Sequence, residues 1–201
     1  MFDTTFEVLY LIGLVAGSVI RGVYTRRSRQ NGIADDRTPR LEWLPLTFAS
    51  MGLLVIPLLY LFTPWLDFAD FDFPTWAGWV GAAVFAAALL LLWRSHADLG
   101  RNWSATLQIR EGHSLVTRGV FRHIRHPMYA AHGLWGIAQA LLLHNWIAGP
   151  AFLATLLPMY LLRVQPEERM MLEHFGEEYR SYMNRTGRVI PRLWRSFTVP
   201  R

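Results

Sequence analysis

Thirteen consecutive residues in the second half of the chain hold an unusual concentration of basic side chains. The stretch 117–129 reads TRGVFRHIRHPMY, and an apolar segment follows from Met128. Arginine offers a planar fork of donors to carboxylates and phosphates, and the charge of histidine changes most easily near neutral pH. The cluster therefore indicates a site for an anionic group beside lipid. A simple basic anchor at a membrane surface is the alternative, but it does not explain the tight placement of Pro127 and Tyr129.

A second charged group follows the last apolar segment. Arg163 and Glu167 are four residues apart, which is one helical turn if the helix continues past the intervening proline. The two apolar segments between the clusters are joined by a short uncharged connector, so we expect a helical hairpin whose charged ends lie close together. This would place Glu167 and Glu168 opposite Arg125 and His126. A surface ion pair without a function is the alternative interpretation.

Several apolar stretches position these clusters. There are five, at residues 6–24, 43–62, 75–93, 129–147 and 151–162. A membrane-spanning helix needs about 20 mostly apolar residues. The first four stretches meet this length, whereas the fifth is short enough to be a re-entrant helix instead. The sequence therefore predicts an all-α integral membrane protein with about five transmembrane helices.

The basic residues indicate the orientation in the membrane. The chain has 20 of them and all are arginines, which fall in three groups at residues 21–40, 94–125 and 163–201. The connector 63–74 has no arginine and carries three aspartates. With five spans every arginine lies on one side, which the positive-inside rule makes cytosolic. We expect a multi-pass protein with its amino terminus outside and its carboxyl terminus in the cytoplasm, in which the net charge of +5 does not indicate nucleic acid.

The organisation along the chain is that of one membrane domain over residues 1–201. Residues 1–93 would hold three helices, and residues 94–201 would hold the helical hairpin, both charged clusters and a cytosolic C-terminal segment. The first helix contains Gly13-x-x-x-Gly17, a spacing that lets another helix approach closely. We favour packing within the same chain over dimerisation, and hence a monomer.

Several kinds of site are disfavoured by the residues themselves. Cysteine is absent, which excludes disulfides, thiolate nucleophiles and cysteine-based zinc sites. His123 and His126 are spaced like metal ligands, but a proline follows directly, and we expect no metal. The glycine-rich motifs of soluble nucleotide-binding folds are also missing. His132 and His144 lie in the fourth span, where we expect polar residues that face the bundle and bond to a neighbouring helix.

A pocket of arginine, histidine and carboxylate groups suits a zwitterionic cofactor. Arginine or histidine would bind its carboxylate, and a glutamate would bind a ribose hydroxyl. S-adenosylmethionine has both features. Because the pocket lies beside lipid, the second substrate can be an amphiphile that arrives from the bilayer, and membrane lipids are expected partners.

Two longer motifs resemble a known family. They are GHSLVTRGVFRHIRHPMY at residues 112–129 and RVQPEERMMLEHFGEEYRSYMNRTGRVIP at residues 163–191. Together they resemble the isoprenylcysteine carboxyl methyltransferase (ICMT) family and its phospholipid methyltransferase relatives. The similarity covers the second half of the chain, from Leu99 to Pro191, and the first two helices carry no signature.

The resemblance implies a membrane methyltransferase whose methyl donor, S-adenosylmethionine, enters from the cytosol and leaves as S-adenosylhomocysteine. Its acceptor would be lipophilic, such as an isoprenylcysteine-type carboxylate. The pocket would be built at the cytosolic face from the loop before the fourth helix and the C-terminal helical segment. The implied cofactor site comprises Gln108, His113, Leu115, Val116, Arg125, His126, Pro127, Tyr129 and Glu168. Arg163 and Glu167 would face the acceptor, with Arg163 orienting its carboxylate.

One departure from the family pattern concerns the sequence G-P-Y-R, which is common in the family. This chain has Val120 and Phe121 at the Pro and Tyr positions. Phenylalanine has no hydroxyl, so a polar role at this position is in doubt.

Two other functions are compatible with the sequence. A membrane NADPH-dependent reductase of the sterol type has a similar R-H-P-x-Y motif, although five spans are few for that class. A non-catalytic membrane scaffold could use the arginine clusters to bind anionic lipid headgroups. Binding of a methyl donor or of NADPH would distinguish these alternatives.

Overall fold

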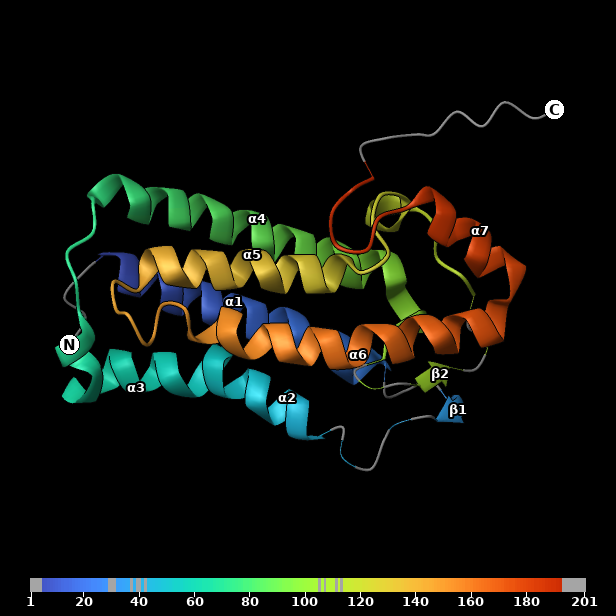
Figure 1. The fold of residues 1–201 in the computed structure, drawn as a ribbon, viewed down its shortest axis with the longest axis horizontal. Coiled ribbons are helices and arrows are strands. Elements are labelled where there is room, and N and C mark those ends of the chain that lie inside the picture. Colours follow the sequence, from blue (N-terminus) through green and yellow to red (C-terminus); the bar gives the residue numbers. More distant parts are fainter. Residues whose placement is uncertain are drawn as a thin grey trace.

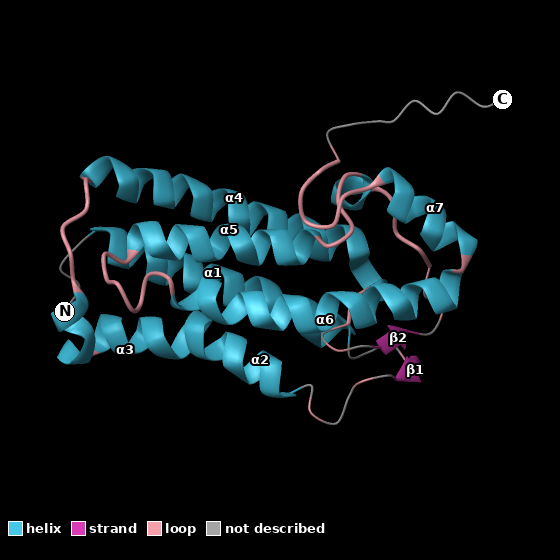
Figure 2. Cartoon of the chain, viewed as in Figure 1, coloured by secondary structure: helices cyan, strands magenta, loops and turns pink. Residues whose placement is uncertain are grey.

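Helices make up most of the chain, and the long ones run side by side along the longest axis of the molecule (Figures 1 and 2). The computed structural model describes residues 5–28, 32–36, 38, 41, 43–104, 106, 108–110, 112 and 114–192. The bundle is built from α1 (Thr5–Ser28), the consecutive elements α2 (Trp43–Ser50), η1 (Met51–Val55) and α3 (Ile56–Phe62), α4 (Thr75–Leu99), α5 (Pro127–Leu142) and α6 (Ala151–Phe175). The shorter elements are β1 (Ile33–Asp36), η2 (Pro64–Ala69), η3 (Gly100–Asn102), β2 (Gln108–Arg110), η4 (Gly119–Arg122) and α7 (Glu177–Arg185).

Three helical segments are long and apolar enough to cross a membrane, judged by length and composition. They are α1, the continuous segment Trp43–Phe62, and α4. The 25 residues of α4 extend about 37 Å, which exceeds the roughly 30 Å of a bilayer's hydrocarbon core. The helical, multi-pass membrane fold expected from the sequence is thus confirmed, while the number of five spans stays a prediction.

The second spanning segment is irregular around Pro57, where the sequence predicts a kink. A π-helical turn, η1, separates α2 from α3, and Pro57 lies at the start of α3. Proline lacks an N–H group and its ring collides with the carbonyl group four residues earlier, here that of Leu53. The wider π-turn accommodates that carbonyl group and keeps the segment continuous.

The core of the bundle depends on close packing of α1 against α4 and α5. A Cβ atom on Gly13 would collide with the Phe85 ring of α4, and one on Gly17 would collide with the Trp135 ring of α5. Phe85 and Trp135 are almost fully buried and meet edge to face. The small-residue stripe of α1 therefore packs within the same chain, as expected.

Both helices of the hairpin end at other residues than their apolar stretches do. The fourth span was expected to reach residue 147, but α5 ends at Leu142. The buried Asn145 side chain explains this, because its carbonyl oxygen accepts bonds from the N–H groups of Ile147 and Ala148 and closes a turn. The second helix extends beyond the apolar stretch 151–162, since α6 continues past Pro166 and through Phe175.

The polar connector after α1 and the loop before α5 meet in a small sheet. Strand β1 pairs with β2 in an antiparallel arrangement, with Asp36 opposite Gln108. The Gln108 side chain also donates to the Asp36 carboxylate at 3.0 Å. These contacts hold Gln108 at the end of the bundle where the arginine clusters lie.

Candidate functional site

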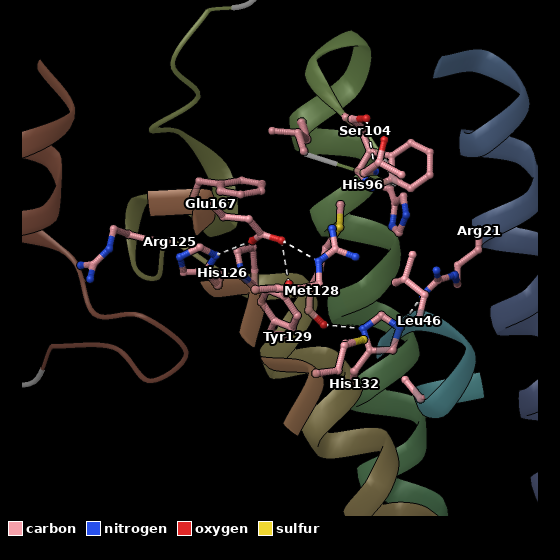
Figure 3. Close-up of a pocket in the computed structure, with 18 of the residues that line it drawn as sticks. Arg21, Leu46, His96, Ser104, Arg125, His126, Met128, Tyr129, His132 and Glu167 are labelled. Atoms are coloured by element: carbon pink, nitrogen blue, oxygen red, sulfur yellow. Dashed lines mark hydrogen bonds and ion pairs between the residues drawn. The ribbon is translucent and has the colours of Figure 1, made fainter. Parts of the chain in front are cut away.

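A cavity of about 600 Å³ lies at the arginine-rich end of the bundle, enclosed by α1, α2, α5, α6 and the loop before α5 (Figure 3). Nine residues of the predicted site line it: Gln108, Leu115, Val116, Arg125, His126, Pro127, Tyr129, Arg163 and Glu167. Glu168 lies next to the cavity without lining it. His113 falls outside the described residues.

The Glu167 carboxylate is held from three sides, as the dashed lines in Figure 3 indicate. The Tyr129 hydroxyl donates to Oε1 at 2.7 Å, and Arg163 Nε lies 3.3 Å from the same oxygen. His126 Nδ1 lies 3.6 Å from Oε2. Because α6 stays helical past Pro166, Arg163 and Glu167 are one turn apart and form the predicted pair, and Tyr129 reaches them from the first turn of α5.

The adjacent Glu168 is the centre of a second, more deeply buried cluster. Its side chain accepts from Arg125 Nε at 3.0 Å and from Arg188 Nη2 at 2.7 Å, and lies 3.3 Å from His126 Nε2. Burial raises the pKa of this carboxyl group, but the hydrogen bonds with His126, Arg188 and Arg125 outweigh burial and lower the pKa to about 2. Glu168 is therefore a carboxylate at any physiological pH.

His126 links the two clusters because its two ring nitrogens face different carboxylates. Nδ1 is directed to Glu167 and Nε2 to Glu168. The ring is fixed in plane by these contacts, and its side chain is only 10% exposed. The predicted juxtaposition of the cluster before α5 with the carboxylates of α6 is thus confirmed.

Arg125 is used mainly to hold the segment that follows α7. Its guanidinium points away from Glu167 in Figure 3, and Nη1 donates to the carbonyl groups of Met183 and Thr186. The backbone N–H of Arg125 also donates to the Gly187 carbonyl group at 2.9 Å. A direct bond from this guanidinium to a cofactor stays a prediction.

A hydroxyl group is present beside Phe121, the position where the common family motif has tyrosine. Tyr182 of α7 donates its hydroxyl to the Phe121 carbonyl oxygen at 2.6 Å, and both side chains line the cavity. Burial raises the pKa of Tyr182, so this hydroxyl stays protonated. The phenylalanine is itself buried and contributes an apolar wall.

Sequence reasoning missed the contribution of the first two helices to this cavity. Arg21 enters from α1, and apolar side chains enter from α2 and η1, namely Leu46, Ala49, Leu53 and Leu54. His132 of α5 also lines the cavity and bonds to Arg21, which confirms the expected bond to a neighbouring helix. His144, by contrast, is surrounded by aromatic rings, and its Nε2 has no hydrogen-bond partner among the described residues. An arginine inside an otherwise apolar helix was the available signal for Arg21.

Comparisons with known proteins agree with this arrangement. Residues 79–173 match the model of the isoprenylcysteine carboxyl methyltransferase (ICMT) family. Protein-S-isoprenylcysteine O-methyltransferase B of Arabidopsis thaliana is 32% identical over 94 residues, which are 46% of this chain and 48% of the relative. Human protein-S-isoprenylcysteine O-methyltransferase is 29% identical over 119 residues, 58% of this chain and 42% of the relative. The chain thus spans about half the length of these relatives.

The fold is also similar to a solved structure, the eukaryotic intramembrane Ras methyltransferase ICMT. The TM-score is 0.52 at 24% identity, and the similarity covers 79% of this chain and 54% of that one. The matched segment 79–173 contains most of α4, all of α5 and the part of α6 that carries Arg163, Glu167 and Glu168. The resemblance seen in the sequence is therefore supported by the comparisons, in which residues 79–173 match the isoprenylcysteine carboxyl methyltransferase family.

Proposed function

We propose that the chain is an integral membrane methyltransferase that uses S-adenosylmethionine and methylates an amphiphilic acceptor at the cytosolic face. An isoprenylcysteine-type carboxylate is the favoured acceptor. The observation that carries the proposal is the composition of the single cavity described above. Its polar wall of His126, Tyr129 and Glu167 meets an apolar wall from α2 and η1, so a polar cofactor and a lipophilic chain can share one space.

The cavity fits the cofactor in size and in the donors around it. Its volume of about 600 Å³ lies within the range of about 300–1,000 Å³ that is usual for such ligands. The cofactor would be held by Gln108, Leu115, Val116, His126, Pro127 and Tyr129, with Arg125 and Glu168 supporting this wall from behind. S-adenosylmethionine supplies a methyl group already activated on a sulfonium, and its transfer to a carboxylate gives a neutral ester and S-adenosylhomocysteine without release of a proton.

The chain's own residues would orient the acceptor. Arg163 is 7% exposed and contacts Glu167 through Nε. A guanidinium fixed in this way presents a defined geometry to an acceptor carboxylate. Because a carboxylate acceptor needs no general base, positioning is the main task, and positioning lowers a barrier by up to about 7–11 kcal/mol in the best cases.

We further propose five membrane crossings, with α5 and α6 completing the bundle. The arginines of the described residues lie at the cavity end, around the ends of α1 and α4 and in α6 and α7. Exposed tryptophans mark both ends of α4, at Trp76 and Trp93. Their separation along the helix is about 25 Å, close to the distance between the two interfaces where tryptophan is enriched. By the positive-inside rule the cavity end is cytosolic and the amino terminus lies outside.

Ligand binding to the purified protein in detergent tests the proposed function. Calorimetric titration should detect S-adenosylhomocysteine binding and no NADPH binding. Incubation with methyl-labelled S-adenosylmethionine and N-acetyl-S-farnesylcysteine should give a labelled methyl ester that mild base hydrolyses. Binding of NADPH without S-adenosylhomocysteine would instead favour a reductase, and binding of neither would favour a scaffold.

A further inference from the structure

Arg21 has no role in the site built so far, although it lines the same cavity. It lies on α1, outside the segment that matches the family, and is surrounded in the sequence by apolar residues of a spanning helix. Figure 3 places its side chain between α1 and α5, directed at His132 and close to Leu46. A long arginine near the end of a spanning helix can usually extend to the membrane surface. The Arg21 side chain is exposed, but its guanidinium is directed at His132 instead.

The contact with His132 defines the state of both side chains. His132 Nδ1 lies 2.6 Å from the Met128 carbonyl oxygen, which can only accept, so Nδ1 carries the hydrogen. Nε2 is then free to accept, and Arg21 Nη1 donates to it at 2.8 Å. The imidazole is also stacked parallel to Trp135 and is buried. His132 therefore orients the Arg21 guanidinium without neutralising its charge.

The charge of Arg21 is not balanced by a carboxylate. Among the described residues none forms an ion pair with it, and Glu167 is the only carboxylate in the cavity lining. Arg163 lines the same cavity as Arg21. Arg21 is exposed by surface area, but a charged residue within a membrane-spanning segment commonly marks a functional position. Arg163 is already paired with Glu167, but the guanidinium groups that line the cavity outnumber this one carboxylate, so the cavity offers a site for an anionic group.

We propose that Arg21, oriented by His132, is a second acceptor-binding residue that acts with Arg163 on the acceptor's anionic headgroup. This inference rests on the proposed methyltransferase function and extends it to the first helix. The neighbouring Leu46, Ala49 and Leu53 would contact the apolar chain of the same acceptor. A methyl ester has lost the anionic charge, so the product would bind more weakly to the two arginines than the substrate does.

Two probes that differ only in charge test the role of Arg21. They are N-acetyl-S-farnesylcysteine, which carries a carboxylate, and its carboxamide. Their dissociation constants are measured on the full chain in nanodiscs. Arg21→Gln keeps a donor for His132 and should weaken binding of the carboxylate about tenfold or more, with little change for the carboxamide. His132→Phe should lower the same carboxylate-to-carboxamide preference while Arg21 remains present.

The matched control is Arg26→Gln, five residues further along α1, where the arginine does not line the cavity. It should bind both probes as the wild type does. S-adenosylhomocysteine affinity is measured on each variant, because a misfolded variant would lose it. Arg21→Lys keeps the charge and should recover part of the preference for the carboxylate.

The result that overturns the inference is a wild type that binds the two probes equally or binds neither, or an Arg21→Gln variant that keeps the wild-type preference. Either result, with S-adenosylhomocysteine binding intact, rejects the role of Arg21 and leaves the proposed function in place. If the wild type neither binds S-adenosylhomocysteine nor transfers a methyl group, the proposed function itself is rejected.

Discussion

Replacing Arg163 with lysine would keep a positive charge at this turn of α6 and remove the planar guanidinium. Arg163 contacts Glu167 through Nε while also lining the cavity, so one side chain serves a protein carboxylate and faces the acceptor space. A lysine ammonium is a point charge and cannot form the two-pronged contact that a carboxylate makes with arginine. We expect cofactor binding to be nearly normal and turnover to fall.

The size of this effect follows from the contact that is lost. A hydrogen bond to a charged group contributes about 1.5–3 kcal/mol. Losing one of two such bonds in the transition state would slow turnover by about 10- to 150-fold. The burial of Arg163 places the expected effect above that of an exposed pair, which is worth about 0–1 kcal/mol.

Calorimetry with S-adenosylhomocysteine and initial rates with labelled methyl donor provide the two measurements. Arg169→Lys is the matched control, because Arg169 lies on the same helix and is exposed outside the cavity. Combining Arg163→Lys with Glu167→Gln completes a double-mutant cycle. If Glu167 acts by holding Arg163, the two effects should fail to add by about 0.5–3 kcal/mol.

Equal losses of cofactor affinity and turnover in Arg163→Lys would refute this reasoning and assign Arg163 to the cofactor site. Unchanged values for both would reduce the Arg163–Glu167 pair to a structural contact. Additive effects in the cycle would show that Glu167 acts independently of Arg163.

Three further predictions concern other parts of the molecule. His126→Ala should weaken S-adenosylhomocysteine binding substantially in calorimetry, whereas the exposed His123→Ala should not; equal affinities would remove His126 from the site. Asp70→Cys should be labelled by an impermeant thiol reagent from outside intact cells, and labelling only after permeabilisation would contradict the orientation. The pKa of Glu168 in the folded protein is about 2, below its usual 4.5. The ionised Glu168 therefore stabilises the folded state fully above pH 4.5, and this contribution is lost as the pH falls toward 2. The melting temperature of the wild type should therefore fall more steeply below pH 4.5 than that of Glu168→Gln, and parallel curves would exclude this linkage.

The contacts between the two charged clusters could be predicted from the sequence. A tight turn between two antiparallel helices places the start of the first helix beside the end of the second. Arg125 and His126 therefore had to lie near Glu167 and Glu168. The sequence left open whether the helix continues past Pro166, because proline usually ends a helix. In the structure α6 continues past Pro166 to Phe175, and Arg163 and Glu167 are paired across that turn.

Other features depend on packing that local patterns do not encode. The contact between Arg21 and His132 requires the angle at which α1 meets α5, and two glycines and two aromatic rings set that angle. The bond from Arg188 to Glu168 requires the chain to return to the loop before α5 after α7. The end of α5 was missed because Asn145 closes its turn with a side chain that could equally have faced solvent.

The return of the chain after α7 has a consequence for biogenesis. The backbone N–H groups of Arg125 and His126 donate to the carbonyl groups of Gly187 and Arg188, each at 2.9 Å. About 60 residues separate these partners, so roughly 3 to 12 s of synthesis pass between them at 5–20 residues per second. The loop before α5, which lines the cavity, therefore acquires these partners only after the helical hairpin has been translated. A nascent chain would enter the bilayer before it could retain a cofactor, and membrane insertion would precede ligand binding.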